Sequence, residues 1–247
     1  MRNTNPILLF STFVLAFPLL LGGCLPFVSK DSEDGEHKYE EREPYPFVQP
    51  EIVDRHRYLS HTPTGNLYSL VPQKIGVVEV RGFGADGDAE VFLKSYTKKV
   101  KSEGGSFLPD HYYVAPDGQI FGGQETDYCG YLARKRAEDA LLVGVLGDFS
   151  QPTHFLSPEQ ERSLVQLCAW LCTRNSIDPG AIVPANEINP EVGELGVNLA
   201  NYFGPTQTLR RDVEKTMALG KEEMEDDSFG ASFRRRKRER PDPLDAF

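Results

Sequence analysis

The middle of the chain alternates between short apolar runs and longer amphipathic stretches. Lys74–Phe83 is rich in apolar and β-branched residues, which is typical of a strand at the centre of a sheet. Asp86-Gly87-Asp88 can cap a helix, and from there to about Glu103 the apolar residues recur at helical spacing. Gly104-Gly105 would end that helix. A buried strand followed by an amphipathic helix predicts a fold that mixes the two kinds of element.

The next segment carries a hairpin signal. His111–Pro116 and Gln119–Gly122 flank Asp117-Gly118, a dipeptide that favours a tight turn between two strands. Leu141–Leu146 is short and apolar throughout, and we expect it to form another buried strand.

One more helix and one more strand follow. Ser157 stands at a helix-capping position, Pro158 would occupy the first turn, and Gln160 completes a capping box. We expect this helix to reach about Arg174, and Ile182–Ile188 to form the last strand. Together these elements predict a mixed central β-sheet with helices on its faces, an α/β or α+β fold.

The amino terminus has the features of a bacterial lipoprotein signal. Arg2 gives a short basic head, Ile7–Leu21 is apolar but too short and too poorly flanked for a spanning helix, and small residues directly precede Cys24. We therefore predict a signal peptide at residues 1–23 and lipidation of Cys24. The alternative is an ordinary cleaved signal with an incidental cysteine. By resemblance to enterobacterial lipoproteins, Leu25 after the cysteine favours an outer-membrane anchor in the bacterial cell envelope, with a periplasmic domain.

Composition divides the remainder of the chain. Residues 24–43 are polar and charge-rich, and they cannot bury enough apolar area to order themselves, so we predict a flexible tether. Residues 44–73 alternate prolines with aromatics and predict an irregular extension laid over a domain at 74–205. Residues 206–247 predict a charged, largely disordered tail, within which 209–226 could form a charged helix.

Charge and cysteines narrow the possible partners. The net charge of −10 argues against general nucleic-acid binding. The basic run Arg234–Arg240 is either a solvated tail or an attachment to anionic lipid headgroups or wall polymers. If lipid consumes Cys24, then Cys129, Cys168 and Cys172 remain, and their spacing is not a zinc pattern. They are either small core residues, or Cys129 pairs with one of the other two.

The order of these motifs resembles a known family. Ile75–Val80, the His111–Phe121 hairpin, Leu141–Leu146 and Ile182–Pro190 follow one another as in the zinc N-acetylmuramoyl-L-alanine amidases of type 2, which include the peptidoglycan recognition proteins. The resemblance covers about half of the chain. It implies a mixed sheet with helices on its faces and, in active members, zinc-dependent hydrolysis of the bond between N-acetylmuramic acid and L-alanine.

The same resemblance places the family's site on residues that cannot perform its chemistry. The first two zinc-histidine positions fall on Glu79 and Ala185, the third ligand on the window 193–195, the catalytic tyrosine on Asp110 and a substrate-side histidine on Leu132. A catalytic zinc needs three protein ligands and an open position for water, and alanine and leucine offer no lone pair. We therefore expect no catalytic residues, no metal and no cofactor, with zinc only if this assignment is wrong.

Carboxylates around these positions leave one alternative open, since a cluster of them would suit Ca²⁺ or Mg²⁺ better than zinc. The candidates are Glu79, Asp110, Glu187, Glu191 and Glu194.

Three functions remain. The chain could be a lipid-anchored pseudoenzyme that binds peptidoglycan without cleaving it, a working metal-dependent amidase, or a protein-docking module of an envelope assembly. For the first, the resemblance implies a cleft in which aromatics and polar groups grip the ligand. The residues we expect to line it are Tyr112, Tyr128, Tyr131, Asn186 and Glu187. An open groove around Glu79, Asp110 and Ala185 favours wall binding, and a filled one favours docking.

Overall fold

The computed structural model describes residues 43–59, 67–84, 87–105 and 107–221. The expected signal peptide, Cys24, nearly all of the tether and the basic run Arg234–Arg240 lie outside these residues. None of the described helices is both long and apolar enough to cross a membrane.

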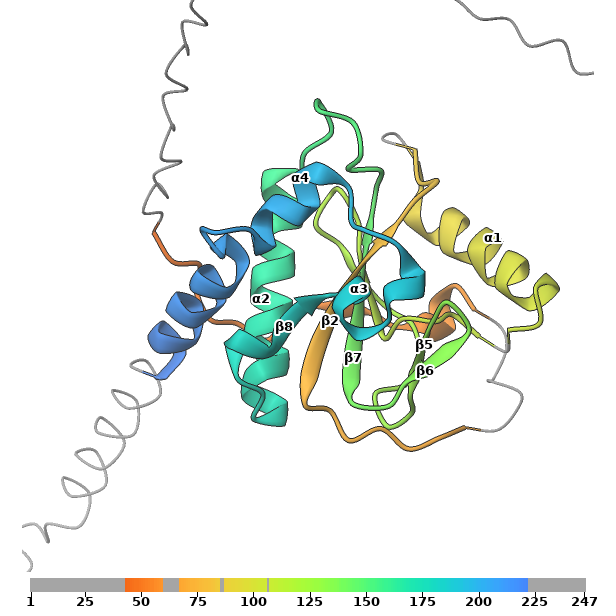
Figure 1. The fold of residues 1–247 in the computed structure, drawn as a ribbon, viewed down its shortest axis with the longest axis horizontal. Coiled ribbons are helices and arrows are strands. Elements are labelled where there is room, and N and C mark those ends of the chain that lie inside the picture. Colours follow the sequence, from red (N-terminus) through yellow and green to blue (C-terminus); the bar gives the residue numbers. More distant parts are fainter. Residues whose placement is uncertain (1–42, 60–66, 85–86, 106, 222–247) are drawn as a thin grey trace, which may run out of the picture. The chain divides into compact units, whose positions relative to one another are not determined.

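Within the described part, a six-stranded mixed sheet has the order β1-β4-β3-β7-β2-β8, and β5 and β6 form a separate antiparallel pair (Figure 1). Strands β2, β7, β8 and β3 run parallel, β4 runs antiparallel to β3, and β1 runs parallel to β4. The strands are β1 (Ile52–Val53), β2 (Lys74–Val80), β3 (Tyr112–Val114), β4 (Ile120–Gly122), β5 (Gly130–Leu132), β6 (Lys135–Ala137), β7 (Ala140–Leu146) and β8 (Ile182–Pro184).

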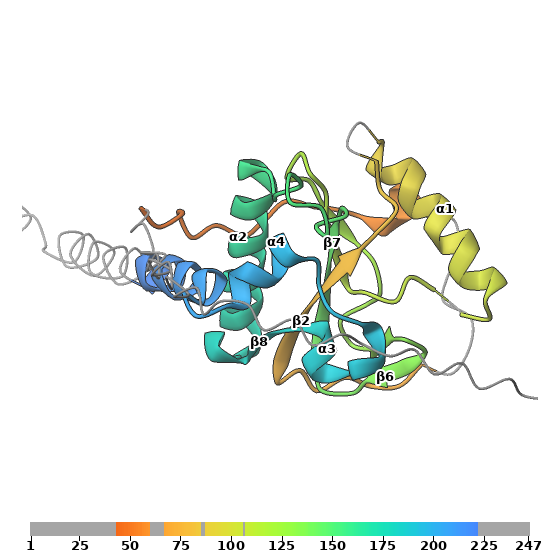
Figure 2. The same ribbon diagram turned by 45° about the horizontal axis from the view of Figure 1, so that its top comes forward.

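Helices cover both faces of the sheet (Figures 1 and 2). Longer helices are α1 (Ala89–Ser102), α2 (Pro158–Asn175) and an unlabelled one at 208–221, and the short ones are α3 (Ala185–Ile188), α4 (Val197–Ala200), η1 (Arg55–Arg57), η2 (Pro179–Ala181), η3 (Pro190–Val192) and η4 (Asn201–Phe203). The Asp88 carboxylate accepts from Val91 N–H and the Ser157 hydroxyl oxygen accepts from Gln160 N–H, as expected of helix caps. The Gln160 side chain does not complete the expected capping box, because its amide donates to the Val114 and Leu146 carbonyl oxygens. The predicted mixed sheet with helices on its faces is confirmed.

Strand β2 divides the core into two faces because successive side chains point in opposite directions. Ile75 and Val77 pack with the residues of α2 in one apolar cluster. Val80 packs beneath α1 in a second cluster, and Val78 contacts a third. The register of β2 on β7, from Lys74 opposite Ala140 to Val80 opposite Leu146, fixes which residues share a face.

The last predicted strand is shorter than expected. The sequence predicts a strand over Ile182–Ile188, but β8 ends at Pro184 and the next four residues form α3. Pro184 has no N–H to extend the strand pairing. Its φ of −65° and ψ of 148° are those of a residue directly before a helix, and it caps α3. The prediction is therefore wrong for the second half of that segment.

The carboxyl-terminal boundary also differs from the expectation. The sequence assigns everything after residue 205 to a charged, largely disordered tail in which 209–226 could form a helix. A helix is present at 208–221, but it is not part of a solvated tail, because Leu209, Val213 and Thr216 on it are at most 1% exposed. Their spacing of four and three residues puts them on one face, which packs into the cluster beneath α2. Residues 222–247 lie outside the described part.

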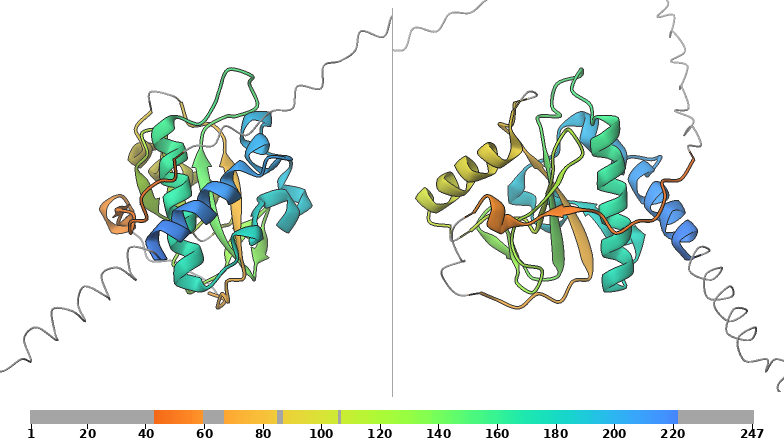
Figure 3. Two further views of the ribbon diagram at one scale, coloured as in Figure 1. Left: turned by 90° about the vertical axis from the view of Figure 1, so that its left-hand side faces the viewer. Right: turned by 180° about the vertical axis from the view of Figure 1, so that it is seen from behind.

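The amino-terminal extension is laid across the domain (Figure 3). Strand β1 pairs with β4, and the Tyr58 ring meets Phe121 edge-on with centroids 5.7 Å apart. Phe47 packs so tightly on Gly220 that a β-carbon there would lie 2.5 Å from the Phe47 Cγ atom. The extension thus contacts both the sheet and the last described helix.

The three cysteines in the described part are free and buried. Cys168 and Cys172 belong to the core beneath α2, and the Cys129 thiol donates a hydrogen bond to the Ser69 carbonyl oxygen at 3.3 Å. Of the two interpretations left open by the sequence, the structure therefore has small core residues and no disulfide.

Candidate functional site

Two of the positions assigned to the family's site lie inside an apolar cluster. Leu132 is 3% exposed and Ala185 is fully buried, and both contact the same group of side chains. The other members of this cluster are Ala137, Ala140 and Leu142, with Val78, Ile188 and Val192 packed against it. A β-carbon on Gly76 would lie only 2.5 Å from the Ile188 Cδ1 atom, so this part of the sheet surface is filled by side chains.

Polar contacts close the cluster from outside. The Asn189 side-chain amide donates to the Leu132 carbonyl oxygen at 2.8 Å, which ties the turn after α3 to strand β5. The exposed ammonium of Lys135 meets the Glu191 carboxylate at 2.7 Å between the same two segments. The β5–β6 hairpin, which carries Leu132, is thereby fastened to the segment after Ala185. Of the two arrangements left open by the sequence, the region around these two residues is filled by side chains.

Glu79 points to the opposite face of β2. Its side chain is 3% exposed, and both carboxylate oxygens accept backbone hydrogen bonds, from Phe149 N–H at 2.9 Å and from Gly196 N–H at 2.5 Å. The Arg81 guanidinium donates to the same two oxygens at 3.0 and 3.1 Å. We call Glu79, Arg81, Phe149 and Gly196 the carboxylate clasp, because it joins the end of β2 to two loops.

The clasp brings Glu79 close to the window 193–195, where the third ligand was expected. Ala185, at the second expected ligand position, lies apart from it. Arg81 also donates to the Glu194 carbonyl oxygen at 3.3 Å, within the window 193–195. A β-carbon on Gly196 would lie 2.3 Å from the Phe149 carbonyl carbon, so only glycine allows these loops to meet. Ala185, in contrast, follows the Pro184 that pairs with Val77, and its cluster lies on the Val78 face.

The residues at these positions do not fit a zinc ion. Glu79 is surrounded by hydrogen-bond donors, and Leu132 and Ala185 have no donor atoms. Within the described ranges, no three His, Cys, Asp or Glu side chains are placed to hold a metal ion, and this applies equally to the alternative carboxylate cluster.

Asp110, at the position of the family's tyrosine, is a buried carboxyl group. It is 1% exposed, and neither carboxylate oxygen has a partner with hydrogen-bond geometry. Burial raises the pKa of Asp110 to about 7, which the neighbouring Tyr113 side chain partly opposes. The Tyr113 hydroxyl oxygen accepts from the Asp110 backbone N–H at 3.1 Å. Such a group can exist as the neutral acid at neutral pH.

His111, beside Asp110, has a structural role. Its Nε2 lies 2.9 Å from the Tyr128 carbonyl oxygen, and its Nδ1 accepts from Leu142 N–H at 2.8 Å. Burial lowers the pKa of His111 to about 4, so the ring is neutral and links β7 to the loop before β5.

The structure places one of the five residues expected to line a cleft, Tyr112, in the core. Tyr112 is 7% exposed and its ring packs edge-on against Trp170 of α2, because position 112 faces the Ile75 side of the sheet. Tyr128 and Tyr131 are half-buried near β5, and Glu187 is exposed on α3. The Asn186 side-chain oxygen is buried without a hydrogen-bond partner among the described residues. The Tyr112 ring thus lies in the core cluster beneath α2.

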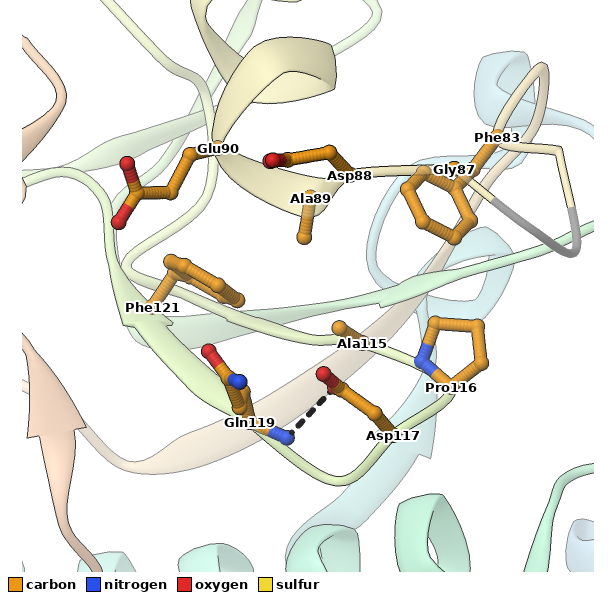
Figure 4. A pocket seen from close by; sticks show the side chains of 10 residues that line it. All are labelled: Phe83, Gly87, Asp88, Ala89, Glu90, Ala115, Pro116, Asp117, Gln119 and Phe121. Atoms are coloured by element: carbon orange, nitrogen blue, oxygen red, sulfur yellow. Dashed lines mark hydrogen bonds between the residues drawn. The ribbon is translucent and has the colours of Figure 1, made fainter.

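A cavity of about 390 Å³ lies elsewhere, between the first turn of α1 and the β3–β4 turn (Figure 4). It is lined by Phe83, Gly87, Asp88, Ala89, Glu90, Ala115, Pro116, Asp117, Gln119 and Phe121. The sequence predicts Asp88 as part of a helix cap and Asp117 as a turn residue, but it does not predict that the two approach one opening. The turn lies near α1 because β3 pairs with β7, and β7 pairs with β2, the strand before α1.

Comparison with known proteins supports the fold. Neither the protein-family models nor the curated protein sequences give a match. Among solved structures, Drosophila peptidoglycan recognition protein SD is 15% identical, covers 64% of this chain and 96% of its own, and has a TM-score of 0.54. The N-acetylmuramoyl-L-alanine amidase LysC from Clostridium intestinale is 18% identical over 64% of this chain and 99% of its own, with a TM-score of 0.52.

A third solved structure is a variant of Drosophila PGRP-LB in complex with tracheal cytotoxin. It is 13% identical, covers 62% of this chain and 94% of its own, and has a TM-score of 0.53. The described domain thus has the fold of N-acetylmuramoyl-L-alanine amidases and peptidoglycan recognition proteins, as the order of motifs suggested. At these identities the likeness concerns the fold.

Proposed function

We propose that this chain is a lipid-anchored protein of the bacterial envelope whose amidase-like domain binds peptidoglycan without cleaving it. One observation carries the non-catalytic part: on this scaffold, Ala185 and Leu132 are buried in an apolar cluster closed by the β5–β6 hairpin. A zinc-activated water needs ligands and an open coordination position, and this cluster offers neither.

The fold supports the choice of ligand. One solved neighbour is an amidase named for the N-acetylmuramoyl-L-alanine bond, and another was solved with tracheal cytotoxin. We carry over to this chain only the class of ligand, peptidoglycan and its fragments.

The chain's organisation supports an anchoring role. Lipidation at Cys24 would hold the protein on the outer membrane, with its domain in the periplasm. Residues 24–43, fully extended, would span at most roughly 70 Å at about 3.4 Å per residue. A domain on such a tether could reach the wall while its anchor stays in the membrane.

Sedimentation with purified sacculi tests this function. We would use the unlipidated Cys24→Ser variant, so that the acyl chains cannot attach to residual membrane. We expect the protein to pellet with sacculi, in equal amounts with added zinc or with a chelator, and to release no stem peptide. Recovery of all the protein in the supernatant would refute wall binding, and released stem peptide would show a working amidase.

Docking to an envelope protein is a second candidate. The filled surface around Ala185 favours it, because a groove for a glycan strand is absent there and the fastened hairpin offers a firm surface instead. Affinity purification of the full-length protein from solubilised envelopes decides this case. A stoichiometric partner together with no sedimentation on sacculi would replace wall binding by docking, and recovery of the protein alone would count against docking.

A further inference from the structure

The cavity between α1 and the β3–β4 turn has two phenyl rings in its wall, and the rest of its lining is mostly polar and acidic. The side chains of Phe83 and Phe121, which are 9% and 2% exposed, form two of its walls. Asp88 and Glu90 approach it from α1, and Asp117 approaches from the turn on the other side (Figure 4). Its volume of about 390 Å³ lies in the range of small-molecule sites, which is about 300–1,000 Å³.

The charge at the cavity opening is negative. Among the described residues, the lining has three carboxylates and neither lysine nor arginine. The amino end of α1 opposes them with the equivalent of about half a positive charge. Lys94 approaches the Glu90 carboxylate only to 3.8 Å, and both side chains are partly exposed, so this pair is weak. Negative charge therefore dominates the opening.

Two of the carboxylates retain free acceptor capacity. One oxygen of Asp88 accepts from Val91 N–H at 3.0 Å, and one oxygen of Asp117 accepts from Gln119 N–H at 3.0 Å. Within the described part of the chain, the second oxygen of each has no hydrogen-bond or ion-pair partner. A ligand with several N–H donors could engage both without breaking an existing contact.

The walls are firm on both sides. The Ser163 hydroxyl donates to the Gly118 carbonyl oxygen at 2.7 Å, and the Ser157 hydroxyl donates to the Pro116 carbonyl oxygen, so α2 holds the turn in place. On the other side, Phe83 meets Phe92 of α1 edge-on at 5.3 Å between centroids. The cavity is thus preformed, which reduces the entropy cost of binding.

We propose that this cavity binds an aliphatic primary ammonium group, with its alkyl chain against the phenyl walls and its charge between the carboxylates. A bare divalent cation fits less well, because no three acidic, histidine or cysteine side chains within the described ranges are placed to hold one. Aromatic faces suit an organic cation, whose methylenes they contact and whose charge they attract. The site is separate from the positions around Ala185 and does not depend on wall binding.

Titration calorimetry with 1,5-diaminopentane tests the site, and Nα-acetyl-lysine methylamide tests whether a lysine side chain is accepted as well as a free diamine. We expect saturable binding of at least one of them, and no binding of pentanol or pentanoate. Glu90→Gln and Asp117→Asn should each weaken binding by about threefold to fivefold, as one partly exposed ion pair contributes. Asparagine is suited to the same turn, so the backbone at 117 should be preserved.

The matched control is Glu214→Gln, which removes the same charge from an exposed position on the helix at 208–221. It should bind like the unaltered protein, which separates a local site from attraction to the net charge. Absence of saturable binding by both amines would overturn the proposal. So would equal binding of pentanol, or equal weakening by Glu214→Gln and by the cavity variants. Binding of the lysine derivative alone would support the site and assign it to peptide ligands.

Discussion

Replacing Glu79 by glutamine tests whether the carboxylate clasp holds the loops at the end of β2. Glutamine keeps the size of the side chain but replaces one oxygen with a donor, which would face either Phe149 N–H or Gly196 N–H. Leaving one buried N–H without an acceptor costs about 1–3 kcal/mol, and weakening the other bond from charged to neutral costs about 1 kcal/mol more. We therefore expect the free energy of unfolding to fall by about 2–4 kcal/mol.

Arg81 provides the matched control. Its side chain is 54% exposed, so its ion pair with Glu79 is largely screened by water, and we expect Arg81→Gln to cost no more than about 1 kcal/mol. Urea unfolding of the purified protein, followed by circular dichroism, gives both values. The reasoning fails if Glu79→Gln unfolds within about 0.5 kcal/mol of the unaltered protein, or if the two variants lose equal stability.

Three further changes probe other buried positions. Burial raises the pKa of Asp110 to about 7 in the folded chain, so its stabilising contribution is complete below about pH 4 and is lost as the pH rises through about 7. Asp110→Asn should therefore raise the unfolding free energy at pH 8 by up to about 4 kcal/mol and flatten its decline between about pH 4 and pH 7, and identical pH profiles would contradict this. Leu209→Ala should cost about 2–5 kcal/mol in urea unfolding because the side chain is 1% exposed, whereas Glu214→Ala on the same helix should cost almost nothing. Ala185→His should lower the melting temperature equally with and without zinc, because it overfills an apolar cluster, and a rise on adding zinc would instead reveal a latent metal site.

Much of the fold could be predicted from local signals. Ser157 and Pro158 mark the start of α2 because capping and the first helical turn depend only on neighbouring residues. The apolar run that forms β7 predicts a buried strand, and all of its residues are buried. These signals require no knowledge of which segments pack together.

The candidate site could be predicted only in part, because it depends on packing between distant segments. An acidic residue near the end of a buried strand does not reveal its partners, and those of Glu79 come from loops 70 and 117 residues further along the chain. Likewise, the charges around Leu209 and Val213 favour a solvated tail when the sequence is considered alone. The structure shows that the face of the helix with these two residues packs into the core. The cavity was missed because Asp88 and Asp117 each had a sufficient local explanation.

The amino-terminal extension determines how the domain would respond to mechanical load. Tension applied from the amino end would act first on the contact between Phe47 and Gly220 of the last described helix, and then on β1, whose two residues pair with β4 of the sheet. The ladder between β2 and β7 has seven paired positions and lies deeper in the sheet. Under tension, the amino-terminal extension should therefore detach before the core unfolds. The chain between the point of attachment and the domain would lengthen while the domain stays folded.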